Sequence, residues 1–240
     1  MEAVVLAGGK GTRLRPYTTI LPKPLMPVGE RPILEIVIGQ LRAAGIKKIT
    51  MAVNHMADII IAFFGNGEKF GVEISYSMED KPLGTVGPIK LIKDLPENFL
   101  VMNGDILTNL NYADLFRAHI ISGASLTIAT YKRDSQIDFG VLEINKATNH
   151  LIGFREKPIY HFDVSMGIYV FKRSLLDRVP VNHPFGIDSL VLAMLADNAQ
   201  VNSYPFNGYW LDIGRPEDYE RANEDIKKHN FALFPLADQI

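Results

Sequence analysis

Residues 2–13 of the chain are EAVVLAGGKGTR, an apolar run that ends in three glycines within four positions. A short β-branched run before turn residues is typical of a strand, and we expect one over residues 2–7. Glycines directly after a strand let backbone N–H groups approach an anion that any Cβ would hold away. The segment therefore predicts a phosphate cradle at the end of the first strand. The alternative is a simple strand-to-helix turn with permissive glycines.

Outward from this loop, apolar runs alternate with segments of helical period, which is typical of βαβ units around a parallel sheet. From about residue 125 the strand-like runs follow one another closely, which indicates antiparallel additions. We predict an α/β fold, a Rossmann-like three-layer sandwich with a mixed, mostly parallel central sheet and antiparallel additions in the second half. The expected strands lie near 49–53, 72–76, 99–103, 125–130, 139–144, 150–154 and 164–171, and the expected helices run from Pro32 to Gly45 and over 56–64.

Composition limits the classes of protein to consider. The 240 residues are 47% hydrophobic and 22% charged, which predicts one globular domain with a packed core. A net charge of -2 gives no overall attraction to nucleic acid or to an anionic membrane. The absence of cysteine excludes disulfides and thiolate metal sites and fits a reducing cytosol. With no signal-peptide pattern and no long apolar run, we expect a soluble, cytoplasmic protein that binds a small phosphate ligand.

The glycine loop differs from two common phosphate loops. A P-loop would need glycine where the chain has Val4 and Ser or Thr in place of Gly11, and the dinucleotide fingerprint would need glycine in place of Leu14. This spacing disfavours a P-loop ATPase and a redox enzyme. Two cations, Arg13 and Lys23, follow the glycines in a proline-stiffened stretch. A guanidinium fork and a movable ammonium both suit phosphate oxygens.

Residues 7–28, AGGKGTRLRPYTTILPKPLMPV, resemble nearly position for position the opening signature of the sugar-1-phosphate nucleotidyltransferases. That family includes the glucose-1-phosphate thymidylyltransferases and the mannose-1-phosphate guanylyltransferases. The resemblance implies a single catalytic domain over residues 1–240, with a nucleotide-binding half at about 1–110, a sugar-binding half at about 111–228 and no C-terminal β-helix. It also implies Mg²⁺ as cofactor, an NTP and a hexose 1-phosphate as substrates, and a homodimer through the later strands.

The resemblance also assigns site residues. It implies that Asp105 and Asp212 bind magnesium, which needs few protein oxygens because waters and substrate phosphates complete its shell. Asp105 follows the apolar run at 99–103, so we expect it at the edge of the sheet where ligands bind. The implied catalytic residues are Arg13, Lys23, Asp105 and Lys157. The implied nucleotide-binding residues are Leu6, Ala7, Gly8, Gly9, Gly11, Thr12, Glu79, Pro82, Gly84, Thr85, Asn103 and Gly104. The implied sugar-binding residues are Gly140, Glu156, Lys157, Ser165 and Gly167.

Some of these assignments have alternatives. The Asn103–Asp105 segment taken alone is also compatible with an Asx turn, and Glu156 with Lys157 is compatible with a solvated charge pair. Ser165 departs from the family, which usually has asparagine there, so a contact with a sugar hydroxyl is in question at this position.

The resemblance implies transfer of a nucleotidyl group to a hexose 1-phosphate with release of pyrophosphate. The segment at 83–87, LGTVG, is more similar to guanylyltransferases, which favours GTP and mannose 1-phosphate as substrates and GDP-mannose as product. Four alternatives remain. They are a UTP- or dTTP-dependent glucose-1-phosphate enzyme, a broad-specificity NDP-sugar synthase, a cytidylyltransferase for a non-sugar phosphate or acidic sugar, and a non-catalytic paralogue that binds NDP-sugar and regulates a partner.

Overall fold

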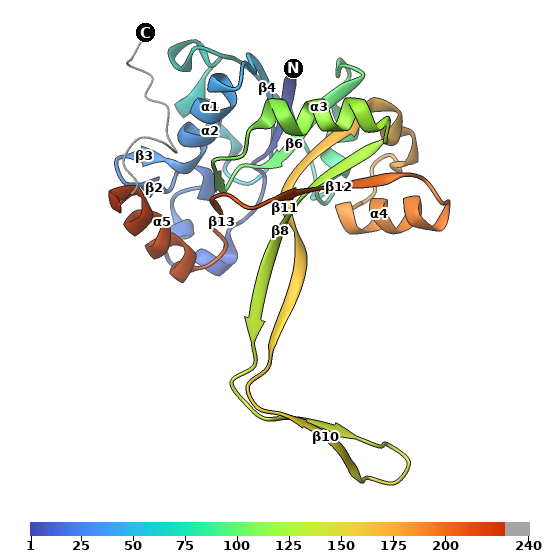
Figure 1. The fold of residues 1–240 in the computed structure, drawn as a ribbon. Helices are drawn as coiled ribbons and strands as arrows, with labels where there is room; N and C mark the ends of the chain where they lie inside the picture. The colour runs from blue at the N-terminus through green and yellow to red at the C-terminus, as the bar shows by residue number, and fades with distance from the viewer. Residues whose placement is uncertain (229–240) are drawn as a thin grey trace.

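A computed structural model describes residues 1–228 of the chain, arranged around a seven-stranded sheet (Figure 1). The strands follow the order β12 (Val201–Phe206), β8 (Leu126–Gln136), β11 (Ile159–Lys172), β6 (Asn98–Asn103), β1 (Glu2–Leu6), β4 (Lys48–Val53) and β5 (Glu73–Met78). Strand β1 pairs in parallel with β4 and β6, β4 with β5, and β8 with β12, whereas β11 runs antiparallel to β6 and β8. The prediction of a mixed, mostly parallel sheet with antiparallel additions is confirmed.

Helices cover both faces of this sheet. One face packs against α1 (Ile33–Ala43), α2 (Ala57–Phe64) and α3 (Tyr112–Ser122), and the other against α4 (Ile187–Ala196) and the 3-10 helices η5 (Gly87–Leu91) and η6 (Arg173–Arg178). The alternation of strand side chains divides β1 between the two layers, because Val5 belongs to the first apolar cluster and Val4 to the second. The prediction of a three-layer sandwich is confirmed.

A third apolar cluster lies beside the sheet and holds the segments that surround the glycine loop. It joins η1 (Thr12–Leu14), β2 (Pro27–Val28), α1, β7 (Ile106–Thr108), β13 (Trp210–Asp212) and α5 (Pro216–Lys228). Strands β7 and β13 pair antiparallel, with Asp212 opposite Ile106. The short elements η2 (Tyr17–Thr19), η3 (Lys23–Leu25), β3 (Arg31–Pro32) and η4 (Glu68–Phe70) complete the first third of the chain. This cluster packs residues between Leu14 and Ile36 against α5, the last described helix.

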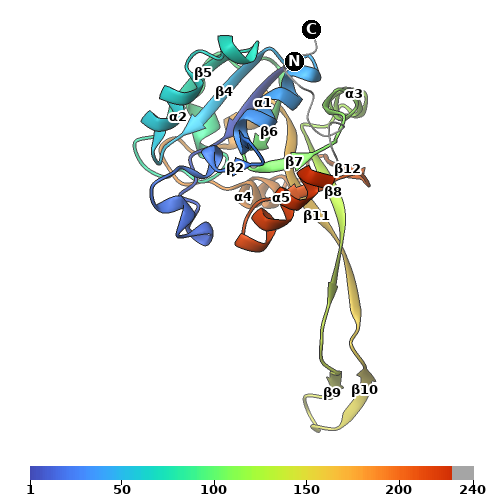
Figure 2. The ribbon, with the colours of Figure 1, turned by 90° about the vertical axis from the view of Figure 1, so that its left-hand side faces the viewer.

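Strands β8 and β11 continue far beyond the sheet as a two-stranded ribbon, which Figures 1 and 2 show projecting away from the body. The ribbon ends in a smaller hairpin of β9 (Val141–Ile144) and β10 (Leu151–Arg155). We call residues 132–163 the arm. Between residues 130 and 164 the sequence predicted only the strands at 139–144 and 150–154, which correspond to β9 and β10. The structure also continues β8 to Gln136 and begins β11 at Ile159, and it pairs these two extensions with each other. Residues 229–240 of the predicted domain lie outside the described part of the chain. In residues 1–228 no helix combines the length and the apolar character needed to cross a bilayer.

Candidate active site

A cleft of about 380 Å³ opens at the carboxyl ends of β1, β4 and β6, next to the glycine loop. Its lining contains twelve of the residues singled out from the sequence: Leu6, Ala7, Gly8, Gly9, Lys23, Glu79, Pro82, Gly84, Thr85, Asn103, Gly104 and Asp105. This position matches the rule that ligands of open α/β sheets bind outside the carboxyl ends of the strands. The fold therefore gathers these predicted residues from four separate segments into one concave surface.

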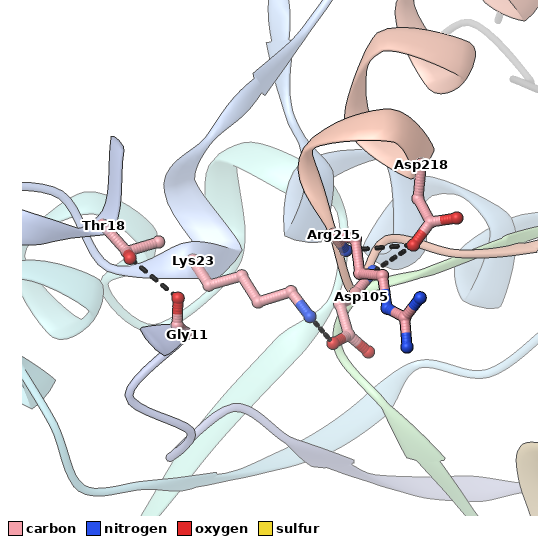
Figure 3. A network of polar contacts seen from close by, with 7 residues as sticks. Gly11, Thr18, Lys23, Asp105, Arg215 and Asp218 are labelled. Atoms are coloured by element: carbon pink, nitrogen blue, oxygen red, sulfur yellow. Dashed lines mark hydrogen bonds and ion pairs between the residues drawn. The ribbon is translucent and has the colours of Figure 1, made fainter. Parts of the chain in front are cut away.

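The glycine loop is open to the cleft at Gly9 and packed against the protein at Gly11. A Cβ added at Gly9 would meet no atom of the described residues within 4 Å, so this backbone faces free space. Gly11 has φ +59°, and a Cβ there would lie 2.9 Å from Thr18 Cγ2. The Thr18 hydroxyl also donates a 2.8 Å hydrogen bond to the Gly11 carbonyl (Figure 3). The loop is thus fixed from behind and left accessible from the cleft.

Lys23 and Asp105 face each other across the cleft floor. The ammonium of Lys23 donates to Asp105 Oδ2, and both side chains are largely buried, with 11% and 20% exposed (Figure 3). Lys23 starts a 3-10 helix between two prolines, Pro22 and Pro24, which fixes the backbone that carries it. The second carboxylate oxygen, Asp105 Oδ1, is buried and has no hydrogen-bond partner among residues 1–228. A buried carboxylate oxygen without a partner is costly unless a ligand satisfies it.

The second acidic residue lies beside the first. The amide of Ile213 donates to the Asp105 carbonyl at 3.1 Å, which brings Asp212 next to Asp105. Burial raises the pKa of Asp212, and the negative charge of Asp105 raises it further, while Lys23 and then Arg13 lower it. Arg13 lies near this loop, because a Cβ on Gly214 would be 3.5 Å from its guanidinium nitrogens. Two carboxylates and two cations therefore share one end of the cleft.

No cluster of three or more His, Cys, Asp or Glu side chains with metal-binding geometry occurs in the described chain. The Asp105–Asp212 pair can therefore supply two protein ligands at most, which suits a magnesium ion that keeps waters and phosphates in its other positions. A zinc site closed by four protein side chains is not available there.

The segment at the far wall of the cleft is held by its own hydrogen bonds. Glu79 accepts from the Leu83 amide at 2.8 Å, so its carboxylate caps this turn. Gly84 has φ +81°, and a Cβ there would lie 2.8 Å from the Phe185 carbonyl oxygen. Thr85 Oγ1 accepts from the Ile187 amide at 2.8 Å. These contacts fix the backbone of residues 79–85 against the loop that precedes α4.

The structure divides the sugar-side residues into two groups. Ser165 and Gly167 lie at the base of the arm beside the cleft, because a Cβ on Gly167 would lie 2.7 Å from Asn103 Nδ2. Ser165 Oγ donates to the Tyr169 hydroxyl at 3.1 Å. The other three, Gly140, Glu156 and Lys157, are exposed residues of the arm, and the structure does not bring them to the cleft of their own chain (Figure 1). The glycine-loop residue Thr12 starts η1 behind the cleft.

Sequence reasoning missed five lining residues, which are Lys10, Pro24, Ala52, Asn54 and Pro88. Asn54 had a usable signal, because it directly follows β4, the parallel neighbour of β1, and so lies at the same edge of the sheet. Its side-chain amide donates to the Glu79 carbonyl at 3.2 Å and links the strand end to the far wall. Lys10 stands within the quoted glycine loop and adds a third cation to the cleft.

Comparison with known proteins gives a consistent set of relatives. The family model described as "Nucleotidyl transferase" matches residues 2–229. The mannose-1-phosphate guanyltransferases of Candida albicans and Schizosaccharomyces pombe are 35% and 37% identical over 227 residues, which are 91% of this chain and 62% of each relative. The chain thus spans less than two thirds of their length. The crystal structure of HddC from Yersinia pseudotuberculosis complexed with GMP-PN matches with TM-score 0.72 and 26% identity, covering 94% of this chain and 99% of that one.

Proposed function

Because the chain belongs to the nucleotidyl transferase family, we propose that it joins a guanine nucleotide to a hexose 1-phosphate, with GTP and mannose 1-phosphate as the substrates and GDP-mannose and pyrophosphate as the products. One observation carries this proposal. The cleft has the glycine loop as one wall and contains the ion pair of Lys23 with Asp105. The other carboxylate oxygen of Asp105 is buried and has no hydrogen-bond partner among the described residues, so a ligand can bind it.

Mg²⁺ suits the residues present. Asp105 Oδ1 is a hard oxygen without a partner in residues 1–228, and Asp212 presents a second carboxylate next to it. We propose that these two side chains would hold the ion. When bound, Mg²⁺ supplies positive charge that neutralises phosphate oxygens during the transfer.

The chemistry needs little from the protein beyond position and charge. An oxygen of the sugar phosphate attacks the α-phosphorus of the nucleotide, the new P–O bond forms, and the bond to the oxygen that bridges to the β-phosphorus breaks. Pyrophosphate leaves with that electron pair. The sugar phosphate is already an anion near neutral pH, so no general base is required. In this proposal the amides of the glycine loop, with Arg13 and Lys23, bind the triphosphate and offset its charge.

The choice of base and sugar rests on two supports. The curated relatives compared above are mannose-1-phosphate guanyltransferases. The HddC structure carries GMP-PN, a guanine nucleotide analogue, in a protein of nearly the same extent as this chain. The rigid segment at residues 79–85 forms the wall that we propose contacts the base. We also propose the cytoplasm as the compartment, supported by a sequence without cysteine.

The test is pyrophosphate release with Mg²⁺ across four NTPs and a panel of hexose 1-phosphates. The variant Asp105→Asn keeps the shape of the side chain but removes its charge. The matched control is Asp177→Asn, because the Asp177 side chain is 85% exposed on η6 and far in sequence from the cleft segments. We expect release with GTP and mannose 1-phosphate, a loss of about 10²-fold or more in Asp105→Asn, and wild-type rates in the control.

Other outcomes have clear meanings. Release with a different NTP or hexose 1-phosphate would keep the reaction and correct the base or sugar. Nucleotide binding without release from any pair would refute the catalytic proposal and favour a regulatory paralogue.

A further inference from the structure

The arm, residues 132–163, is the part of the molecule that its own fold leaves uncovered. Strand β12 stops pairing with β8 at Tyr131, and β6 pairs with β11 only from Ile168 onward. Within residues 1–228 the two strands of the arm therefore hydrogen-bond only to each other. A two-stranded ribbon is marginally stable in water without a surface to pack on, and both of its edges expose unpaired backbone groups. The arm therefore needs a surface that its own chain does not supply.

The tip of the arm is amphipathic. Leu142 lies opposite Phe154, and Ile144 lies opposite Leu151, so these four side chains share one face of the β9–β10 hairpin. Each of the four is at least 50% exposed. Glu143, which alternates with them, pairs with Arg155 at 3.4 Å. A sheet with one apolar face is stable when that face is buried against another layer.

The apolar surface of the arm is large enough for a stable interface. Nine of the nineteen exposed large apolar side chains in the described residues lie on the arm. With roughly 100 Å² exposed on each half-exposed side chain, they offer about 900 Å². A standard protein interface buries about 800 Å² on each partner. The nine residues are Ile137, Phe139, Leu142, Ile144, Leu151, Ile152, Phe154, Ile159 and Phe162.

The cleft and the arm carry different parts of the predicted site. The residues that line the cleft lie between Leu6 and Asp105, and the later half of the chain adds Asp212 next to Asp105 and Gly167 beside Asn103. Glu156 and Lys157, in contrast, are exposed on the arm. Lys157 lies eight residues before Ser165 at the cleft edge, which in an extended strand is about 26 Å. With the arm extended, Lys157 cannot reach the cleft of its own chain.

We propose that two copies of the chain exchange arms, so that Glu156 and Lys157 of each copy complete the sugar side of the other copy's cleft. This inference rests on the proposed function, in which the cleft binds a sugar 1-phosphate. Each copy also offers exposed apolar side chains close in sequence to residues that line its cleft, because Ile20, three residues before Lys23, is 84% exposed and Met78, next to Glu79, is 57% exposed. The exchange is reciprocal and so closes as a two-fold dimer.

Complementation between two inactive variants tests the shared site. Asp105→Asn disables the cleft and Lys157→Met disables the arm, and dimers that contain one copy of each are isolated through two different affinity tags. If the arm acts in the other copy, one cleft of each mixed dimer has both residues intact, and about half of the wild-type activity returns. If each arm serves its own cleft, both clefts stay defective. A pair with both changes in the body, Asp105→Asn with Asp212→Asn, is the matched control and should recover nothing.

The two-tag purification gives two results that would overturn the proposal. One is the absence of any mixed dimer. The other is a mixed dimer no more active than either parent variant.

A second measurement does not depend on activity. Sedimentation velocity should give a dimer for the wild-type chain and a monomer for the double variant Leu142→Asp, Phe154→Asp, which charges the apolar face of the tip. The control is Leu192→Asp on α4, a residue that is 67% exposed on the body, and it should remain a dimer. A wild-type monomer at tens of micromolar, or a dimer that survives the change at the tip, would overturn the exchange. An inactive wild-type dimer that depends on the tip would instead refute the proposed function and leave the exchange standing.

Discussion

Replacing Gly11 with alanine tests how the glycine loop is built. Gly11 has φ +59°, a conformation that costs an L-residue about 1–2 kcal/mol. The added Cβ would also lie 2.9 Å from Thr18 Cγ2 and 3.2 Å from Lys23 Cβ, closer than such atoms approach without displacement. Together these effects predict a loss of about 2–3 kcal/mol in the free energy of unfolding. For a chain of this size that loss lowers Tm by about 5–10 °C.

A matched variant separates the backbone cost from the crowding. Gly123 has φ +66° at the end of α3, and a Cβ there would meet no atom of the described residues within 4 Å. Gly123→Ala should therefore cost only the backbone term, about 1 kcal/mol, and lower Tm by about 2–4 °C. Calorimetric Tm values for both variants, with pyrophosphate release at 25 °C, provide the assay. Gly11→Ala should also lose activity while folded, because the added Cβ would push against Lys23 Cβ and displace that side chain, whereas Gly123→Ala should keep wild-type kcat.

Equal Tm losses for Gly11→Ala and Gly123→Ala would refute the crowding argument. Full activity in a destabilised Gly11→Ala would refute the link between the loop and Lys23. Gly9→Ala completes the set, because its Cβ would enter the cleft without touching described protein atoms. It should leave Tm unchanged and raise the Kd for nucleotide, measured by calorimetric titration.

Three further predictions concern charge. Lys23→Met should reduce kcat by about 10²-fold or more, measured by pyrophosphate release, because it removes a phosphate-binding cation and leaves Asp105 without its partner. Asp212→Asn should raise the Mg²⁺ concentration that gives the half-maximal rate by at least about tenfold. The measurement removes metal with EDTA and then titrates Mg²⁺ back into the assay. An unchanged half-maximal Mg²⁺ concentration would exclude Asp212 as a ligand. Burial, and then the Lys172 charge, lower the pKa of His119 below its ordinary 6.5. Since unfolded His119 binds a proton more readily, its contribution to the unfolding free energy should be constant above pH 6.5 and fall as pH drops from 6.5 toward the lowered value. Urea unfolding should show a smaller fall in His119→Gln.

The body of the fold was predictable because its determinants are local. The strands at 2–7, 49–53 and 99–103 are apolar runs buried between two helical layers, and they occur within a residue of their predicted bounds. Pro32 precedes the first helical residue of α1 instead of lying inside the helix, since its backbone is extended, with ψ 142°. Gly45 follows the end of α1 with φ +81°, as a helix stop requires.

The sequence predicted many of the residues that line the candidate cleft, but not which of them contact one another. The sequence marked Asp105 and Lys23 as separate functional groups, and their ion pair joins residues 82 positions apart, so it depends on the fold between them. The role of Glu79 as a cap for the Leu83 amide likewise follows from a local turn that composition does not indicate. Asn54 escaped notice because a lone asparagine after a strand is common in loops, and only the adjacency of β4 to β1 gives it a place in the cleft.

The extent of β8 shows why the connecting part of the arm was missed, although the strands of its tip were predicted at 139–144 and 150–154, and it supports the proposed use of the arm. The predicted strand stopped at residue 130 because Lys132 to Gln136 are all polar, and a sheet core needs apolar residues on at least one face. Backbone hydrogen bonds pair β8 with β11 regardless of side-chain polarity, and a ribbon with both faces in solvent accepts polar residues on either side. Along this strand apolar residues return after Gln136, at Ile137 and Phe139 and then in the tip hairpin, where solvent exposure is just as high. The partner strand adds exposed Ile159 and Phe162 opposite the polar stretch. A ribbon that leaves the sheet through a polar stretch of β8 and exposes apolar residues on its other strand and at its tip has the pattern of a segment that reaches across solvent to a second surface.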